Sequence, residues 1–410
     1  MIREKRNIRK KFITIFLSLS IVIFAFIFLS PGIPLPNYNF KIPSNFACLA
    51  WAESGDSGKD QKEQEAIKEA IILATDWLLS KQRSDGSWPI ITKDKNPCLV
   101  ATGLYGLETI NKLLSLDWLD GDFVDLLLLS RGRAINFILS SQKDEGYWES
   151  LSFIPWNKVE VTTTALSGLV SCFANSDYPD YPEAQRETQV RVQMQIQPQT
   201  QPQTQTQPQI QSSTQTQMQT QIQKGINWLL EQQKENGSWS DDCWDTIWAL
   251  RLFLDYGYNP DDPVVKKAGS WLIEDQKKSG SWKTDLSHLD QFGSLWTTQP
   301  AIFTLAKTGQ YQDSLSKGLK YLRKEQNRSG SFGHSDAAKT GMALLAFCSL
   351  DKYPDLKEEY KDCAEEAVEW FLEKQKSKGT WPGGFHPFDI VDTSLALWGL
   401  IEYLQSVCNF

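Results

Sequence analysis

The segment Lys224–Trp239 reads KGINWLLEQQKENGSW, and its pattern decides the fold because the chain repeats it. In this pattern an aromatic residue is followed by Gln five residues on, Gly nine on and a second aromatic residue eleven on. Six segments fit: Trp77-Gln82-Gly86-Trp88, Phe137-Gln142-Gly146-Trp148, Trp228-Gln233-Gly237-Trp239, Trp271-Gln276-Gly280-Trp282, Tyr321-Gln326-Gly330-Phe332 and Trp370-Gln375-Gly379-Trp381. Four positions kept in six copies indicate a repeat protein. We call this pattern the repeat phrase.

Each repeat phrase is typical of a helix end and the turn that follows it. Before the first copy, residues 66–78 carry apolar side chains at three- and four-residue spacing, which indicates an amphipathic helix. The Gly lies where a left-handed helix cap is favoured, and the Gln can bond backbone groups left unpaired at the helix end. Nine of the sixteen Trp residues occupy the aromatic positions of the phrase, so we expect them to build scaffold.

A second signature follows the phrase and predicts a second helix in every repeat. It consists of Thr, Ala three residues on, Leu or Ile four on and an apolar residue seven on, which is one helix face. It begins at Thr162, Thr246, Thr298, Thr340 and Thr393, with a looser copy at Thr102. Six helix pairs favour a closed ring over an open solenoid, because closure removes the need for capping repeats. The predicted fold class is therefore all-α.

Composition and charge indicate a globular domain and argue against one class of partner. The chain has 410 residues, 41% of them hydrophobic, which is enough for a large core. Its net charge is −8, yet six Lys and Arg residues fall within the first eleven positions. From residue 12 onward, 36 basic and 49 acidic residues leave a charge of −13. An acidic body argues against a nucleic-acid partner.

The N-terminus is predicted to be a signal or membrane-anchor helix. The basic flank precedes an apolar run, residues 12–29, which as a helix would be about 27 Å long and could cross a bilayer core. A basic flank stays in the cytoplasm, so we expect the rest of the chain to face the extracytoplasmic side, either anchored or secreted. The sequence leaves open whether the helix is cleaved. The expected organisation is a flank and helix at 1–30, a linker at 31–60 and one ring domain at 61–410.

One insertion interrupts the predicted ring. Successive repeat phrases lie 43 to 60 residues apart, except for 91 between the second and third. The excess contains sixteen Gln residues between Gln189 and Gln223, mixed with Thr, Pro and Ser. Such a composition predicts a disordered surface insertion, which we place at residues 185–223.

The common motifs of serine hydrolases, zinc proteases, dinucleotide-binding proteins, NTPases and Cys-rich metal sites do not accompany the repeats. The seven Cys residues form no CxxC pair, and four of them lie in apolar helical patterns where Cys acts as a small core residue. The patterns GxSxG, HExxH, GxGxxG and the P-loop are missing from the sequence. We therefore expect no cofactor and no metal.

The repeat phrase resembles the QW repeat of squalene and oxidosqualene cyclases, and more broadly the repeats of protein prenyltransferase β subunits. The resemblance covers about residues 66–410 without the Gln-rich tract. It implies an α6/α6 toroid, in which outer helices wrap inner helices that ring a largely apolar cavity. It also implies that the ligand is an isoprenoid or a similar lipid, and that any catalysis resembles terpene cyclisation.

The same resemblance implies candidate catalytic acids. Squalene-hopene-type cyclases carry Asp-x-Asp-Asp-Thr on an inner helix, and the middle Asp protonates the substrate. Residues 242–246 and 389–393 are similar, but Trp244 and Val391 stand at the proton-donor position. The candidate acids are Asp245, Asp392, Asp242 and Asp389. The alternative is that these residues cap helices and complement the helix dipole. A prenyltransferase-like zinc site would need Asp241, Cys243 and a His before a Thr, but Asp392 stands before Thr393.

Four Trp residues on the predicted inner helices lie outside the repeat phrase and are candidates for ligand contact. Their π faces would stabilise a carbocation, with core packing as the alternative. Two residues beside the second acidic segment complete the predicted set, which is Trp244, Trp248, Trp296, Trp398, Phe388 and His386. The sequence leaves three readings open: an enzyme, a non-catalytic binding toroid, and a site completed by a second subunit.

Overall fold

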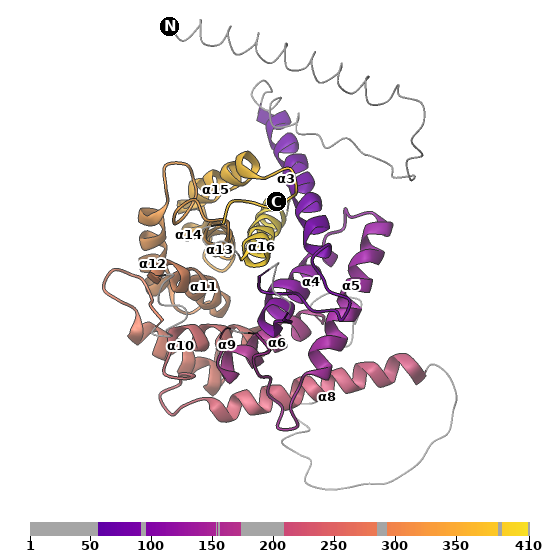
Figure 1. Ribbon diagram of the computed structural model, residues 1–410. Coiled ribbons are helices and arrows are strands. Elements are labelled where there is room, and N and C mark those ends of the chain that lie inside the picture. The colour runs from indigo at the N-terminus through magenta and orange to yellow at the C-terminus, as the bar shows by residue number, and fades with distance from the viewer. Residues whose placement is uncertain are drawn as a thin grey trace, which may run out of the picture. The chain divides into compact units, whose positions relative to one another are not determined.

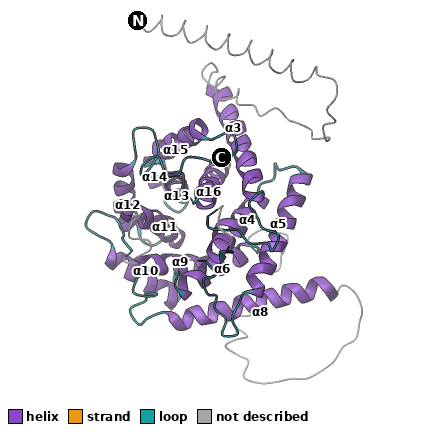
Figure 2. Cartoon of the chain, viewed as in Figure 1, coloured by secondary structure: helices purple, strands orange, loops and turns teal. Residues whose placement is uncertain are grey.

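Each repeat phrase ends an outer helix and leads the chain into an inner helix, so that six helix pairs form a ring (Figure 1). The computed structural model describes residues 56–91, 96–152, 154, 156–173, 209–284, 293–383 and 388–408. Within these residues the chain forms helices, turns and loops with isolated β-bridges but no strand (Figure 2). The predicted all-α class is confirmed for this part of the chain.

The outer helices are α3 (Asp56–Leu79), α5 (Gly121–Ser140), α8 (Gln209–Gln232), α10 (Pro263–Asp275), α12 (Gln312–Glu325) and α15 (Lys361–Lys374). The inner helices are the π-helical segment η2 (Ala101–Leu107) with its continuation α4 (Glu108–Leu114), then α6 (Lys158–Ser171), α9 (Cys243–Asp255), α11 (Gly293–Thr308), α13 (Ala337–Cys348) and α16 (Asp389–Cys408). A short helix, α14 (Pro354–Glu359), precedes α15. Consecutive inner helices contact each other, and α16 contacts η2, so the inner layer is closed.

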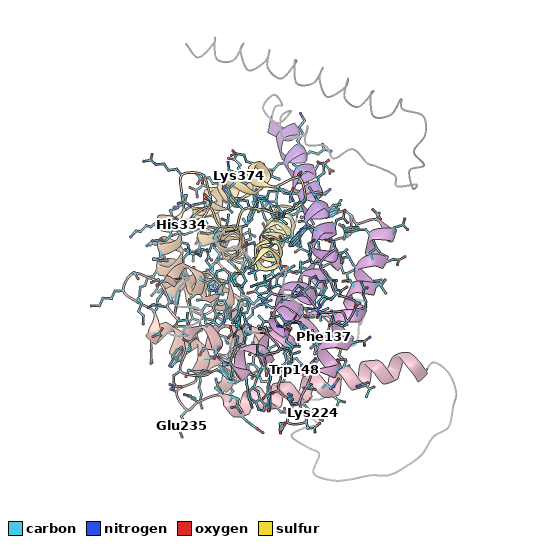
Figure 3. The ribbon with its side chains drawn as sticks, viewed as in Figure 1. Phe137, Trp148, Lys224, Glu235, His334 and Lys374 are labelled. Atoms are coloured by element: carbon cyan, nitrogen blue, oxygen red, sulfur yellow. The ribbon has the colours of Figure 1, made fainter. Side chains whose placement is uncertain are left out.

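The recurring Gln and Gly of the repeat phrase join each outer helix to the next. The Gln amide donates one hydrogen bond to the carbonyl of the Gly four residues on, and a second bond of 2.8–3.0 Å to a backbone carbonyl of the following outer helix. The Gly has φ between 83° and 101°, where only Gly is unstrained. A Cβ on it would overlap the backbone of the same following helix. In one such joint Gly146 lies against the carbonyl of Lys224, which is labelled in Figure 3.

The sixth joint returns to the first repeat and closes the ring. Gln375 donates to the carbonyl of Ala70, across 305 residues of sequence, at 2.8 Å. Gly379 lies directly against the backbone of Leu73, also in α3. The predicted closed ring is therefore present, and no open end of the repeat array needs a cap.

The second aromatic residue of the phrase ties the turn to the inner helix. In five repeats its backbone N–H donates to the hydroxyl of the signature Thr at 3.0 Å. Where the residue is Trp, its indole N–H donates to a carbonyl ten residues earlier at 2.7–2.9 Å. These rings are buried in the core, as expected for scaffold.

The helices described here all belong to one unit, residues 47–410. The predicted signal or anchor helix and most of the linker lie outside the described residues. Among the described helices, none is long and apolar enough to span a membrane.

Residues 209–223 of the predicted disordered insertion are helical, as part of α8, which begins at Gln209. Met218, Ile222, Ile226 and Leu229 recur on one face of α8 and are buried. The intervening Gln residues hid this apolar period in the sequence. Residues 185–208 of the predicted insertion lie outside the described residues.

Candidate functional site

The predicted acids lie where inner helices begin, at one end of the lumen. Asp245 and Asp392 are in the first turns of α9 and α16, and they are 1% and 6% exposed. Glu160, in the first turn of α6, is 3% exposed and was not predicted. Tyr105 of η2 lies near both Glu160 and Asp392, and burial together with these charges raises its pKa. We call this end of the lumen, defined by Glu160, Asp245 and Asp392, the acid end.

Asp245 is the most fully enclosed of the predicted acids. Its Oδ2 accepts a hydrogen bond of 2.9 Å from the Asn157 side chain, while its Oδ1 is buried without a hydrogen-bond partner among the described residues. Burial and the negative charges of Glu160 and Asp242 raise the pKa of Asp245 to about 7, although Ser240 and Asn157 oppose the rise. Asp245 therefore holds a proton over much of the acidic range, unlike an ordinary Asp.

Asn157 connects Asp245 to Glu160. It is the N-cap of α6, where its Oδ1 accepts from the backbone N–H of Glu160 at 2.9 Å. Its Nδ2 donates to Asp245 on the neighbouring helix. One capping side chain thus fixes the two carboxyl-bearing turns relative to each other, which pre-organises the acid end.

Three of the four predicted Trp residues meet at the acid end. Trp244 stacks on Trp296 with a centroid distance of 5.9 Å and meets Trp248 edge-on at 5.5 Å. The indole N–H of Trp244 donates to Glu160 Oε1 at 2.8 Å. The residue at the predicted proton-donor position therefore orients a carboxyl group from the neighbouring helix. Trp398 lies apart from this stack: it is fully buried and donates to Thr109 Oγ1 at 2.8 Å.

Asp392 belongs to a separate cluster and is not paired with Asp245. Its neighbours are Asp336, the N-cap of α13, together with Asp389 and the cations Lys339 and Lys376. Burial and the two neighbouring carboxylates raise the pKa of Asp392 well above its ordinary value. Its carboxylate lies directly against Gly383, where a Cβ would overlap Oδ2.

The remaining predicted residues have more ordinary roles. Asp242 caps α9, because its Oδ1 accepts from the Trp244 backbone N–H at 2.7 Å, and it also accepts from Thr284. Asp389 is the first residue of α16, and Phe388, just before it, packs half-buried against the core. His386 lies outside the described residues. For Asp242 the structure therefore provides the capping role that the sequence left open beside catalysis.

The middle of the lumen is charged, contrary to the largely apolar cavity that the resemblance implies. Arg251 of α9 forms a buried ion pair with Glu108 of α4 and a second one, at 3.2 Å, with Asp255. Its guanidinium carbon lies 5.2–5.5 Å from the ring centroids of Trp248, Phe303 and Trp398. The aromatic faces that would receive a cationic ligand here already hold a cation of the protein itself.

Aligning the repeats on the signature Thr identifies the layers of the lumen. Two residues before this Thr stand Glu160, Trp244 and Trp296, and Trp244 contacts the other two. Five residues after it stand Arg251, Phe303 and Trp398, which also meet. This alignment is the signal that could have revealed Glu160 and Arg251 from the sequence.

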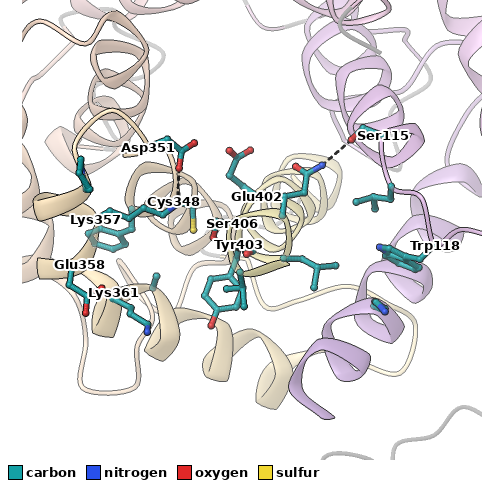
Figure 4. A pocket seen from close by; sticks show the side chains of 18 of the residues that line it. Ser115, Trp118, Cys348, Asp351, Lys357, Glu358, Lys361, Glu402, Tyr403 and Ser406 are labelled. Carbon is teal, nitrogen blue, oxygen red and sulfur yellow. Dashed lines mark hydrogen bonds and ion pairs between the residues drawn. The ribbon is translucent and has the colours of Figure 1, made fainter. Parts of the chain in front are cut away.

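A cavity of about 1130 Å³ opens at the other end of the lumen, where α4, α13 and α16 end (Figure 4). Apolar and aromatic side chains such as Trp118, Phe347 and Tyr403 line it together with several Lys, Asp and Glu residues. Glu402 and Lys357 on its wall pair with Lys112 and Asp351. This cavity was not predicted, because its walls come largely from the ends of α4, α13 and α16 and the segments beyond them, which neither the repeat phrase nor the Thr signature covers.

No cluster of three His, Cys, Asp or Glu side chains able to hold a metal ion occurs within the described part of the chain. Cys243, which the zinc alternative would use, instead donates its thiol to Asp275 at 2.8 Å. Burial and Asp275 raise the pKa of this thiol, which opposes the thiolate that a zinc ligand requires.

Comparison with known proteins identifies the fold. The type II terpene cyclase MstE from Scytonema superposes with a TM-score of 0.56 at 14% identity, over 84% of this chain and 99% of that one. A protein from Actinoplanes gives a TM-score of 0.54 at 13% identity, over 82% and 99% of the two chains. A glycosyl hydrolase of family 88 from Bacteroides vulgatus gives 0.54 at 10% identity, over 84% and 99%. The chain is an α/α toroid.

The toroid is shared by proteins that act on different molecules, so the fold alone does not assign a reaction. A variant of the Scytonema cyclase has also been solved with geranylgeranyl dihydroxybenzoate, its substrate, and matches this toroid with a TM-score of 0.55. No protein-family model and no curated protein matches the sequence.

Proposed function

We propose that this toroid binds an isoprenoid or similar apolar chain at the acid end of its lumen, and that Asp245, assisted by Glu160, supplies a proton for its cyclisation or rearrangement. One observation carries the proposal. Asp245 is 1% exposed, has a buried carboxyl oxygen without a partner among the described residues, and lies near Glu160, which accepts a hydrogen bond from Trp244 of the Trp244–Trp296 stack.

The chemistry follows from the environment of Asp245. Its pKa of about 7 keeps the carboxyl protonated at mildly acidic pH, so that it can act as a general acid. Transfer of this proton to an alkene carbon of the ligand forms a C–H bond, breaks the π bond and leaves a cation. A second alkene can attack that cation and close a ring, and loss of a proton back to the carboxylate restores the acid. The reaction is then an isomerisation that needs no cofactor.

The Trp stack would stabilise the cation. Trp244 and Trp296 are buried, and an aromatic face attracts a cation most strongly where water is excluded. The Scytonema cyclase, which acts on a prenylated substrate, supports the choice of an isoprenoid ligand for this chain. The resemblance of the repeat phrase to the QW repeat of squalene cyclases supports it from the sequence.

Product analysis tests this proposal. The full chain would be incubated with geraniol, farnesol, geranylgeraniol and squalene at pH 6, and the products identified by gas chromatography with mass spectrometry. We expect a cyclised or isomerised product that is lost in Asp245→Asn and reduced in Glu160→Gln. Asp313→Asn, the same change at an exposed position on α12, is the matched control and should retain the product. Recovery of unaltered substrate from every sample would refute catalysis.

A non-catalytic binding toroid is the second candidate, and one observation favours it. The position that carries the proton donor in the resembling cyclases holds Trp244 in one segment and Val391 in the other. In that case a lipid would copurify with the chain and remain unaltered, and Asp245→Asn would change its affinity rather than any product. Mass spectrometry of the bound lipid distinguishes the two candidates.

We also propose that the toroid acts outside the cytoplasm, anchored or secreted. The basic flank and the apolar run at residues 12–29 support this assignment. Protease added to intact cells should digest the toroid if it faces outward, and protection from protease in intact cells would refute the assignment. Whether a second subunit completes the site can be read from the molar mass of the purified chain.

A further inference from the structure

Arg251 lies in the middle of the lumen, where aromatic rings and acidic side chains surround its guanidinium. Its side chain is 7% exposed, and its guanidinium lies among the faces of Trp248, Phe303 and Trp398. These three aromatic residues come from three different inner helices, α9, α11 and α16. Because Arg251 and all three rings are buried, side chains fill this cross-section of the lumen.

Ion pairs fix the guanidinium in this position. Glu108 accepts from both terminal nitrogens of Arg251, and Asp255 lies 3.2 Å from its Nε. Asp255 in turn pairs with Lys307 at 2.8 Å, and Lys112, on the same helix as Glu108, pairs with Glu402 at 3.5 Å. The charges therefore bridge α4, α9, α11 and α16. A prenyl chain offers no group that could replace a buried partner, so it cannot displace Arg251 at low cost.

We propose that Arg251 is a depth stop that closes the lumen and limits the length of the ligand held at the acid end. This inference rests on the proposed function, because it concerns the same ligand. The layer of Glu160, Trp244 and Trp296 lies seven residues before the layer of Arg251 along the inner helices. At 1.5 Å per residue the two layers are about 10 Å apart, the length of roughly two isoprene units.

The other side of the stop leads towards the cavity at the far end of the lumen. Glu402 both lines that cavity and pairs with Lys112, one turn beyond Glu108. Lys112 also lies over the ring of Trp398, at 5.7 Å from its centroid. Removing the guanidinium and its partner charge would therefore open the acid end towards a space of about 1130 Å³ and admit longer chains.

Binding of prenyl alcohols of increasing length tests the depth stop. Affinities for geraniol, farnesol and geranylgeraniol would be measured by titration of the intrinsic Trp fluorescence of the full chain. We expect the wild type to bind geraniol at least tenfold more tightly than geranylgeraniol. The double variant Arg251→Ala/Glu108→Gln, which removes both charges and the length of the Arg side chain, should reverse this order. Arg328→Ala, at an exposed position after α12, is the matched control and should behave as the wild type.

The outcomes separate this inference from the proposed function. If the wild type binds geranylgeraniol as tightly as geraniol, the depth stop is wrong while the ligand class stands, and this result needs no variant to fold. An unchanged order in a double variant with wild-type circular dichroism would also overturn it. If no alcohol of any length binds, the proposed function fails and the depth stop fails with it.

Discussion

The buried proton of Asp245 should make the stability of the toroid depend on pH in a way that Asp245→Asn removes. In the folded chain the pKa of Asp245 is about 7, against 3.8 for an ordinary Asp. The folded state therefore binds a proton that the unfolded state has already released between these values. The stabilising contribution is complete below about pH 3.8 and is lost as the pH rises through about 7.

The magnitude follows from the two pKa values. The whole difference corresponds to about 4 kcal/mol, of which about 3 kcal/mol falls between pH 5 and pH 8. For a domain of this size, an unfolding entropy of about 2.1 cal/mol/K per residue converts 3 kcal/mol into a change in Tm of about 4 °C. Asparagine keeps the shape of the side chain and an oxygen for the bond from Asn157, but it has no charge to bury.

Thermal unfolding followed by circular dichroism provides the assay. Between pH 5 and pH 8 the Tm of the wild type should fall by about 4 °C more than that of Asp245→Asn, because other groups titrate equally in both proteins. Asp313→Asn, at an exposed position, should follow the wild type at every pH. Parallel curves for the wild type and Asp245→Asn would show that Asp245 is ionised in the folded chain, and the argument for it as an acid would fail.

Three further predictions concern the ring and its lumen. Gly379→Ala should lower the free energy of unfolding by about 3 kcal/mol in urea, because Gly379 has φ of 91° and lies against α3, whereas Gly121→Ala, in open space, should not lower it. Trp244→Phe should lower the free energy of unfolding by about 1–3 kcal/mol, because it removes the indole N–H that donates to Glu160 Oε1. Trp271→Phe, at a half-exposed position, is the control, and an equal loss in both variants would contradict this prediction. Arg251→Met alone should lower the free energy of unfolding by about 3–5 kcal/mol, because Glu108 stays buried without a counter-charge. Adding Glu108→Gln should recover most of this loss. Equal stabilities of the single and double variants would argue against a buried charge pair.

The sequence predicts the ring well because the residues that build it interact within one repeat or with the next. Gln, Gly and Trp of the phrase each have a local partner, so their spacing records the turn directly. The start of α8 at Gln209 escaped prediction because its few apolar residues are separated by Gln. The Gln-rich composition predicted disorder for that segment. It is helical instead, because a helix buries Met218 and Ile222.

The site is harder to predict because its partners are distant in the sequence. Glu160 and Trp244 are 84 residues apart, and Glu108 and Arg251 are 143 apart. In the sequence of one apolar helix, a single charged residue gives no indication of its partner. The partner is found only when the repeats are aligned on the signature Thr. Once aligned, neighbouring repeats show which side chains share a layer of the lumen. The roles of Asp245 and Asp392 in catalysis stay predictions.

The bond from Gln375 to Ala70 has a consequence for how the molecule comes apart. In an open row of repeats the terminal ones have a single neighbour, so they fray first and unfolding proceeds inward. Here the last repeat packs against the first, so each of the six repeats has a neighbour on both sides. The toroid should therefore unfold as one cooperative unit, in which α3 exchanges its amide hydrogens no faster than α10.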